Sequence, residues 1–511
     1  MPVYYPLTVL DFLERAENVY PDRAAVVDEP DQPAPGLGEL SYRDLAALAR
    51  AQAARLDQLG VPTGGRVAVI SQNSARLLTS FFGVSGWGRV LVPVNFRLSL
   101  PEISYIVEHS GAQVVYADPS RKEVLDNLDV PHKFVLGDDD ALFLHDTEPA
   151  PWAEPDEGAT ATINYTSGTT ARPKGVQLTH RNLWLNATVF GLHTSVSDRD
   201  VYLHTLPMFH ANGWGMPYGV TGMGGTHVVL RQVDGAEILR RIERYGVTLM
   251  CAAPAVVNAA LDAAESWSGE IPGRDRVRIV VAGAPPPSKT IERVLTRLGW
   301  EFVQIYGLTE TSPIVTVNRM RAEWDDLEPI EKARKLMRAG APALGVRVTT
   351  DRAGEVLTAS NHNLDGYWQQ PEETARVQEG NWFHTGDGGY LDDEGYLVIS
   401  DRKKDVIISG GENVSSIEVE DALMSHPAVK EVAVIGIPDE KWGELVTGLV
   451  VGDGSGVSAD DLIAHCRSTL AGYKCPKRID FVESLPRTAT GKLQKFKLRE
   501  PFWAGHERQV N

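Results

Sequence analysis

The sequence predicts an α/β protein with a large N-terminal domain of parallel-type sheets and crossover helices, followed by a small α+β C-terminal domain. Its 511 residues are about three times the roughly 150 residues of a typical domain, so several packed units are expected. The hydrophobic (43%) and charged (23%) fractions are ordinary for a globular chain. Short β-branched runs alternate with capped helical segments through most of the chain, which is typical of parallel strands joined by helices.

The first elements show this alternation clearly. Ser41 begins SYRDLAALARAQAARLDQLG, in which apolar residues recur on one helical face until Gly60 ends the helix. A second helix is expected after Ser99, with Pro101 in its first turn. The strands expected around these helices are VAVI at 67–70, VLVPV at 90–94 and VVYAD at 114–118.

The alternation continues through the middle of the chain. The expected elements are the strand THVVL (226–230), the helix AEILRRIERYG (236–246), and strands within VTLMCAAP (247–254), VRIVVAGAP (277–285) and EFVQIYG (301–307). Open α/β sheets bind ligands beyond the carboxyl ends of their strands. Residues that directly follow position 307 are therefore candidates for a site.

The pattern changes after about residue 385. The segments GYLVIS, VKEVAVIGIPD, ELVTGLVV and RIDFV are then mixed with helices capped near Ser415 or Ser416 and at Ser458. Such a mixture of hairpins and helices indicates a separate small α+β domain. We place the large domain at 1–400, a hinge at 401–404 and the small domain at 405–511.

Charge and cysteine content exclude several classes of protein. The chain has 50 Lys and Arg against 68 Asp and Glu, a net charge of −18, which disfavours a nucleic-acid partner. Its three cysteines, Cys251, Cys466 and Cys475, have neither metal-site nor disulfide-framework spacing. No apolar run approaches the roughly 20 residues that span a bilayer, and no targeting segment is recognised. We therefore expect a cytoplasmic protein with no membrane span.

Residues 470–499 depart from this acidity, because they carry eight Lys and Arg against two acidic residues. This basic segment is either an anion site or a tail that folds against acidic neighbours.

The most informative stretch is YTSGTTARPKG, from Tyr165 to Gly175, directly after the strand-like TATIN. Its hydroxyl side chains, glycines and Lys174 supply the hydrogen-bond donors and the cation that a polyphosphate needs. It does not fit GxxxxGK[ST], so a P-loop ATPase or kinase is not supported. A flexible Ser/Thr/Gly linker is the alternative, but the Pro and Lys before the second glycine and the capped helix at Thr179 favour a phosphate loop.

This stretch resembles the phosphate-binding signature of the adenylate-forming superfamily, which includes acyl-CoA synthetases, carrier-protein adenylation domains and beetle luciferases. Further segments resemble motifs of that superfamily in the expected order: LPMFHANGWG (206–215), VAGAPP (281–286), YGLTETSP (306–313), HTGD (384–387), DRKKDVIISGGENV (401–414) and PRTATGKLQK (486–495). The similarity covers nearly the whole chain, and the motifs are closest to those of fatty-acyl-CoA ligases.

The resemblance implies a two-step reaction. A carboxylate attacks the α-phosphate of ATP to give an acyl-adenylate and pyrophosphate, and the thiol of coenzyme A then displaces AMP. ATP, Mg²⁺ and coenzyme A are the implied cofactors, and a hydrophobic fatty or aryl acid is the implied substrate. Two like unit charges about 4 Å apart repel by about 4 kcal/mol at an effective dielectric near 20, so cations must neutralise the approach of the acid to ATP.

The resemblance also implies the phosphate and metal contacts. Thr309 would contact the α-phosphate, and Glu310 with Thr166 would hold Mg²⁺, which prefers hard oxygen ligands. For Glu310, a solvated carboxylate at a strand end is the alternative. The residues that would cradle the outer phosphates are Thr166, Ser167, Gly168, Thr169, Thr170 and Lys174.

Further positions would hold the rest of the nucleotide. Tyr306 and Gly307 would line the junction of adenine and acyl group, and Asp387 would accept hydrogen bonds from the ribose hydroxyls. Arg402 would support ribose or phosphate. Lys492 would bridge the carboxylate and the α-phosphate during adenylation. An ordinary turn aspartate and an exposed lysine are the alternatives for Asp387 and Lys492.

The implied second step involves rotation of a mobile C-terminal domain about the hinge residue Lys404. The loop that would then face the adenylate contains Gly410 and Gly411, within Ser409 to Asn413, and glycines there permit close approach of a pantetheine arm. The implied acid pocket is formed by His210, Trp214, Gly283, Ala284 and Pro285. A hydrogen-bonded core histidine and ordinary core packing are the alternatives for His210 and Trp214.

The sequence departs from the superfamily pattern between Val346 and Tyr367, where TTDRAG indicates a bare hairpin turn and Ala359 replaces a common arginine. Two other functions remain open: an adenylate-forming enzyme with another acceptor or oxyanion (a carrier-protein thiol, an amine or nitrite), and an inactive nucleotide-binding regulatory module. We expect a small-molecule acid as partner, allow a homodimer, and do not favour a carrier protein.

Overall fold

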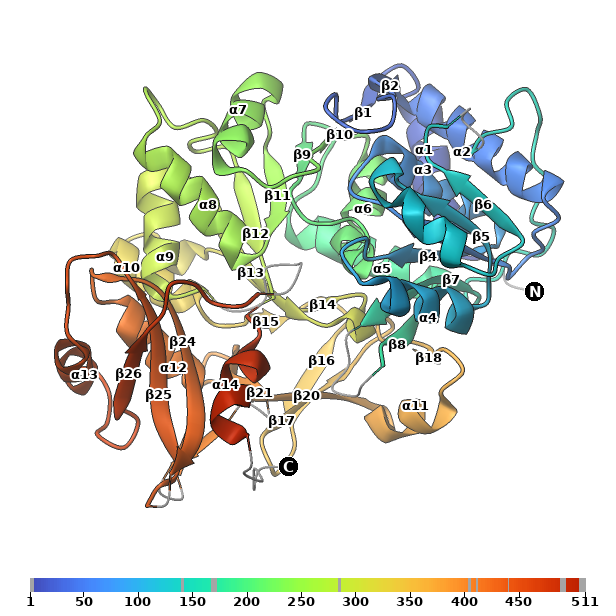
Figure 1. Cartoon of the computed structure of the whole chain (residues 1–511). Coiled ribbons are helices and arrows are strands. Elements are labelled where there is room, and N and C mark those ends of the chain that lie inside the picture. The colour runs from blue at the N-terminus through green and yellow to red at the C-terminus, as the bar shows by residue number, and fades with distance from the viewer. Residues whose placement is uncertain are drawn as a thin grey trace.

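The computed structural model describes residues 4–138, 142–166, 172–283, 286–402, 406–409, 412–439, 441–487 and 493–504. It confirms the predicted α/β class: two large sheets with crossover helices form most of the N-terminal part, and a smaller sheet with its own helices forms the C-terminal part (Figure 1).

The first large sheet is predominantly parallel, and buried apolar residues fill its central strands β11 and β12. Antiparallel pairing occurs at its ends, where β13 meets β14, β14 meets β15, and β1 meets β2. In spatial order its strands are β15 (Ala341–Pro342), β14 (Ile314–Asn318), β13 (Glu301–Gly307), β12 (Arg278–Val281), β11 (Leu249–Ala252), β9 (Val201–His204), β10 (Thr226–Val229), β1 (Ala24–Val27) and β2 (Glu39–Ser41).

The second large sheet carries the glycine-rich hairpin. β7 and β8 pair antiparallel, and a short strand from much later in the chain, β18, pairs antiparallel with β8. In spatial order its strands are β18 (Gly366–Tyr367), β8 (Lys174–Thr179), β7 (Thr160–Thr166), β4 (Val90–Val94), β3 (Arg66–Ile70), β5 (Ala112–Ala117) and β6 (His132–Val135).

A third sheet, which the sequence analysis did not anticipate, is wholly antiparallel and lies between the large sheets and the C-terminal part in the chain. TTDRAG forms its first turn, between β16 and β17, as the sequence indicated. Its strands are β16 (Arg347–Thr350), β17 (Glu355–Ala359), β20 (Trp382–Leu391), β19 (Gln378–Glu379) and β21 (Leu397–Arg402).

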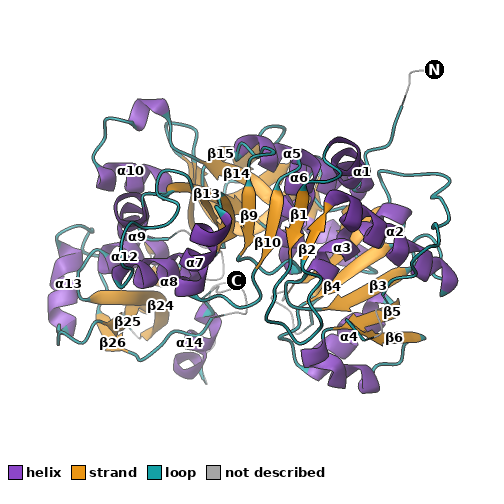
Figure 2. Cartoon of the chain, turned by 90° about the horizontal axis from the view of Figure 1, so that it is seen from above, coloured by secondary structure: helices purple, strands orange, loops and turns teal. Residues whose placement is uncertain are grey.

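Helices cover the large sheets (Figure 2). Hydroxyl and amide caps fix where several of them begin: the Ser41 hydroxyl accepts the N–H of Asp44, and the Thr179 hydroxyl accepts that of Asn182. The helices of this part are α1 (Leu10–Val19), α2 (Tyr42–Gln58), α3 (Ala75–Gly83), α4 (Leu100–Ser110), α5 (His180–His193), α6 (Met216–Met223), α7 (Gly235–Tyr245), α8 (Pro254–Glu265), α9 (Ser288–Arg293), α10 (Pro329–Leu336) and α11 (Pro371–Val377).

The first large sheet is buried on both faces, which explains its continuous apolar strands. Along β12, Ile279 and Val281 face the core formed with α7 and α8, whereas Val280 faces the opposite core. The main core lies between the two large sheets and includes Tyr42, Phe81 and Tyr218. No helix in the described ranges is both long and apolar enough to cross a membrane.

The C-terminal part has its own apolar core around Ile407, Val434 and Leu462. Ser415 and Ser458 cap α12 and α13 as the sequence predicted. Asp421 of α12 contacts the large domain, because its Oδ1 accepts the Ser288 N–H (2.8 Å) and hydroxyl (3.0 Å). The elements are β22 (Ile407–Ser409), β23 (Glu412–Val414), α12 (Ser416–Met424), β24 (Val429–Asp439), β25 (Gly443–Gly452), α13 (Ala459–Arg467), β26 (Arg478–Phe481) and α14 (Lys495–Trp503).

Two histidines are buried side by side in the first large sheet. His204 Nε2 on β9 lies 3.0 Å from His227 Nδ1 on β10, and His227 Nε2 lies 3.0 Å from the Thr221 hydroxyl of α6. Burial lowers the pKa of His227 to about 3, and burial together with His227 lowers the pKa of His204 well below its ordinary value. The pair is therefore neutral in the folded protein near neutral pH.

These histidines predict a loss of stability in acid. Unfolded histidines titrate near pH 6.5, so stability from the neutral pair is complete above that pH and falls as the pH drops below it, by about 1.4 kcal/mol per histidine at about pH 5.5. Between about pH 7.5 and 5.5, the free energy of unfolding should therefore fall less in His227→Gln than in the unaltered protein. The difference should be about 1.4 kcal/mol, measured by urea denaturation. An equal fall in both proteins would contradict this prediction.

Candidate active site

The β7–β8 hairpin brings the two ends of the predicted phosphate loop together. Thr166 and Lys174 are paired in register, and both side chains are partly exposed. The sequence-predicted residues Ser167, Gly168, Thr169 and Thr170 lie outside the described residues. The loop is held at its flanks, because the Tyr165 hydroxyl lies 2.8 Å from His109 Nδ1 and the Arg172 guanidinium lies 5.4 Å from the centre of the Tyr105 ring.

Lys174 makes two contacts with segments far along the chain. Its Nζ donates to Glu373 Oε2 of α11 at 2.6 Å and lies 5.0 Å from the centre of the Tyr367 ring on β18. Tyr367 is itself buried. The cation is therefore held between a carboxylate and an aromatic face.

Glu310 lies directly beyond the carboxyl end of β13, in the short turn Thr309–Thr311. Its side-chain Oε1 accepts the Tyr367 hydroxyl at 3.0 Å, and its backbone carbonyl accepts the Leu364 N–H at 2.7 Å. Burial, with Glu310 nearby, raises the pKa of Tyr367. Tyr367 therefore joins Lys174 to Glu310, a role that the sequence analysis missed because β18 has only two residues and no periodicity.

The predicted nucleoside contacts also lie together. The Tyr306 hydroxyl, at the end of β13, donates to Asp387 Oδ2 of β20 at 2.8 Å, and Asp387 is buried. Gly307 follows, where a Cβ would fall 1.6 Å from the Pro313 carbonyl oxygen, so only glycine fits. Arg402 is opposite Asp387 in the β20–β21 register, and its side chain lies outside the described residues.

The predicted acid-pocket residues come from a turn with left-handed backbone. Residues 211–214 have φ between 37° and 57°, although only Gly213 among them is a glycine. The Asn212 amide donates to the Thr162 hydroxyl of β7 at 2.9 Å and anchors the turn. Trp214 is 4% exposed, in a cluster with Phe190 and Ile305, whereas His210, at the start of the turn, is partly exposed.

Of the predicted residues that remain, Gly283 is described and the others are not. Gly283 is exposed, with φ +97° and no atom within 4 Å of the position of a Cβ. The others lie outside the described residues: Ala284 and Pro285 of the acid pocket, the hinge residue Lys404, Gly410 and Gly411 of the thiol loop, and the lysine expected at the α-phosphate, Lys492.

The basic C-terminal segment is largely paired with acidic side chains. Lys474 Nζ donates to Glu418 at 2.7 and 2.8 Å, and Arg478 donates to Asp480 at 2.8 Å. Lys495 pairs with Glu420 at 2.8 Å. These contacts support the reading of this segment as a tail that folds against acidic neighbours.

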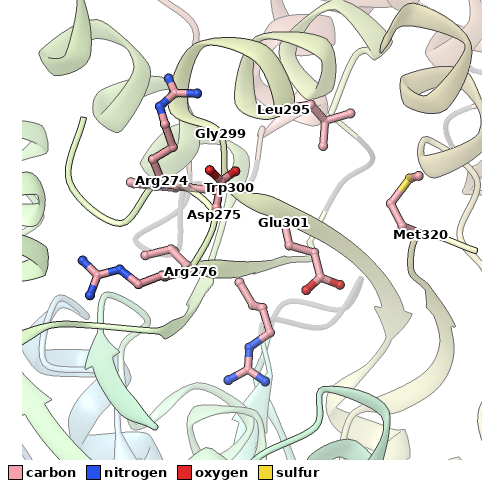
Figure 3. A pocket seen from close by; sticks show the side chains of 10 residues that line it. Arg274, Asp275, Arg276, Leu295, Gly299, Trp300, Glu301 and Met320 are labelled. Carbon is pink, nitrogen blue, oxygen red and sulfur yellow. The ribbon is translucent and has the colours of Figure 1, made fainter. Parts of the chain in front are cut away.

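A cavity of about 450 Å³ opens elsewhere, at the amino ends of β12 and β13 (Figure 3). Its lining includes Arg276, Arg278 and Glu301. Arg278 pairs with Asp200, and Glu301 pairs with Arg319, so much of its charge is neutralised internally. Because the strands are parallel, this cavity lies at the opposite edge of the sheet from Glu310.

The contacts of Tyr306 and Tyr367 gather three charged side chains near the carboxyl end of β13. They are the Lys174 ammonium and the carboxylates of Glu310 and Asp387. Lys174 and Thr166 suit phosphate oxygens, Glu310 and the Thr166 hydroxyl have the oxygen donors that Mg²⁺ prefers, and Asp387 is an acceptor suited to hydroxyl groups. This arrangement defines an adenylate-forming class of protein.

Comparison with known proteins supports this class. Residues 13–368 match the AMP-binding enzyme family, and residues 418–492 match the AMP-binding enzyme C-terminal domain. The chain belongs to the AMP-binding enzyme family, and it is an AMP-forming acyl-CoA synthetase.

Relatives match over nearly their whole length. The chain is 36% identical to "Probable acyl-activating enzyme 9" of Arabidopsis thaliana, with 97% of each chain covered. It is 37% identical to "2-methylpropanoate--CoA ligase CCL4" of Humulus lupulus, covering 97% of this chain and 95% of that one. The crystal structure of the anthranilate CoA ligase AuaEII in complex with anthranoyl-AMP is similar with a TM-score of 0.87 and 27% identity, covering 98% of both chains.

The Tyr367 hydroxyl predicts a measurable effect on adenylation. Tyr367→Phe removes the hydrogen bond to Glu310 but keeps the ring beside Lys174, and a hydrogen bond to a charged group contributes about 1.5–3 kcal/mol. We expect at least about a tenfold loss of ATP–pyrophosphate exchange, with only a small fall in the melting temperature, because the same hydrogen bond also stabilises the fold. Tyr390→Phe, at an exposed tyrosine on β20, is the control; equal losses in both variants would contradict the role of Tyr367.

Proposed function

We propose that this acyl-CoA synthetase activates a hydrophobic carboxylic acid, fatty or aryl, with a preference for short aliphatic chains. The observation that carries the proposal is the burial of Trp214 in an apolar cluster at the predicted acid pocket. A buried indole occupies the volume that a long acyl chain needs.

The named acids of similar proteins support a compact substrate. One relative is a ligase of 2-methylpropanoate, a small branched aliphatic acid, and one similar structure holds anthranoyl-AMP, which has a single aromatic ring. Both acids are small and partly apolar, in agreement with the proposed preference.

We further propose the roles of the charged residues. Lys174 and Thr166 contact the β- and γ-phosphates, Thr309 contacts the α-phosphate, and the Glu310 carboxylate with the Thr166 hydroxyl holds Mg²⁺. In the described part of the chain no three His, Cys, Asp or Glu side chains cluster as metal ligands, which fits an ion that is held by one carboxylate together with substrate phosphates. Such an ion supplies charge neutralisation at the phosphates.

The protein's own residues then position the reactants. Asp387, oriented by the Tyr306 hydroxyl, accepts the ribose hydroxyls and fixes the nucleoside. Lys492 neutralises the acid and the α-phosphate as the carboxylate oxygen forms its bond to phosphorus and the bond to pyrophosphate breaks. The coenzyme A thiol next attacks the acyl carbon, and AMP departs with the electron pair of the broken carbon–oxygen bond.

We propose that the two half-reactions use different orientations of a small domain, 405–511, about a hinge at 401–404. The hydrogen bonds from Ser288 to Asp421 link the domains in the orientation described here. A single carboxylate contact of this kind is weak enough to break during a rotation.

Substrate size can be tested with a panel of acids. Pyrophosphate release and mass detection of the thioester, with and without coenzyme A, should identify a short aliphatic acid as best. Trp214→Gly removes the indole and also relieves the left-handed backbone, which costs a non-glycine residue about 1–2 kcal/mol. We expect it to raise the kcat/KM ratio of octanoate to butyrate at least about tenfold.

Trp324, which is also 4% exposed but lies in another core cluster, gives the control. Trp324→Ala should leave the acid ratio unchanged even if it lowers stability. A best substrate with a long chain in the unaltered enzyme would reject the proposed preference, and AMP release that is indifferent to coenzyme A would reject the acceptor.

The proposed role of Lys492 separates the two half-reactions. Because this lysine acts only while the carboxylate approaches ATP, Lys492→Ala should reduce adenylation by at least about a hundredfold. The same variant should convert chemically prepared acyl-adenylate and coenzyme A to thioester at the unaltered rate. Loss of both half-reactions together would contradict the assignment.

A further inference from the structure

The ion pair between Lys174 and Glu373 joins residues that are 199 positions apart in the sequence. The lysine side chain is 16% exposed and the glutamate side chain 27% exposed. The other carboxylate oxygen of Glu373 accepts from Arg376, whose side chain is largely exposed. Glu373 is thus a carboxylate held directly against Lys174, which begins the strand that follows the predicted phosphate loop.

The position of Glu373 is fixed by the backbone of α11. The Thr374 hydroxyl, next to Glu373, accepts the Tyr367 N–H at 2.9 Å, which ties α11 to β18. β18 pairs with β8, the strand that begins with Lys174. The hydrogen bond from Lys174 is the main cause that lowers the pKa of Glu373, so the carboxylate is ionised near neutral pH.

A lysine ammonium has three N–H donors and one unit of charge. When phosphate oxygens approach Lys174, they meet a carboxylate that already accepts one donor at 2.6 Å. Like charges about 4 Å apart repel by about 1 kcal/mol in water and by more at a partly buried site. Glu373 must therefore weaken phosphate binding or move away from Lys174.

We propose that Glu373 is an internal competitor of the β- and γ-phosphates for Lys174, and that it promotes release of pyrophosphate after adenylation. This inference rests on the proposed contact of Lys174 with the phosphates. Without nucleotide the carboxylate neutralises the partly buried lysine, and after the first half-reaction it returns to Lys174 as pyrophosphate leaves. The competition acts on ATP and pyrophosphate but not on AMP, which lacks the outer phosphates.

The test compares Glu373→Gln with Glu372→Gln. The Gln side chain at 373 keeps the shape and removes the charge, whereas Glu372 is exposed on the same helix and serves as the matched control. We expect Glu373→Gln to bind α,β-methylene-ATP and pyrophosphate about fivefold more tightly by calorimetry, with unchanged affinity for AMP. Glu372→Gln should match the unaltered enzyme for all three ligands.

Other results would overturn the proposal. Weaker binding of α,β-methylene-ATP by Glu373→Gln would mean that Glu373 positions Lys174 productively, and unchanged binding would mean that the carboxylate does not compete. A gain that extends equally to AMP would also contradict it. Glu373→Ala provides a second test of the same expectation if the glutamine side chain retains the contact.

A third variant separates this inference from the proposed function. If Lys174→Met leaves the affinity for α,β-methylene-ATP unchanged, the phosphate contact of Lys174 is itself wrong. If Lys174→Met weakens binding but Glu373→Gln has no effect, only the competition is wrong. If Lys174 contacts the phosphates and Glu373 competes with them, the effect of Glu373→Gln should disappear in the Lys174→Met background.

Discussion

The site depends on the pairing of β18 with β8. This short antiparallel contact brings Tyr367 beside Lys174, although the two residues are separated by most of the first large sheet in the chain. The Tyr367 ring then lies against the cation while its hydroxyl bonds to Glu310. One backbone pairing therefore sets the positions of Lys174 and of the carboxylate proposed to hold magnesium, and the adjoining α11 places Glu373 against Lys174.

Contiguous motifs made much of the fold and site predictable. The strands before Tyr165 and Tyr306 and the caps at Ser41 and Thr179 follow from local patterns, because periodicity and capping are properties of neighbouring residues. Tyr367 and Glu373 could not be found in this way. Their roles come from contacts between distant segments, for which a single sequence carries no local signal. The antiparallel sheet of β16, β17, β19, β20 and β21 was missed because its pairing joins strands that are separated along the chain, such as β17 with β20.

The turn that carries Trp214 shows how strain is stored at the proposed acid pocket. Three residues that are not glycine adopt positive φ there, an arrangement that costs about 1–2 kcal/mol per residue. Packing of Trp214 with Phe190 and Ile305 and the hydrogen bond from Asn212 to Thr162 offset that cost. Thr162 lies on β7, the strand that ends at Thr166, so the same strand anchors this turn and leads to the predicted phosphate loop.

The sheets that carry the site limit which parts of the enzyme can move between the two proposed half-reactions. Lys174 and Asp387 lie on strands of these sheets, and Glu310 and Trp214 lie in the turns 309–311 and 210–215, so the proposed acyl-adenylate site stays in one place. The groups proposed to exchange belong to the C-terminal part, whose contact with α9 includes a single carboxylate, Asp421. Breaking a contact of that size costs far less than rearranging a buried sheet. The proposed rotation of the C-terminal part over a fixed nucleotide site would therefore cost less than a rearrangement of the sheets.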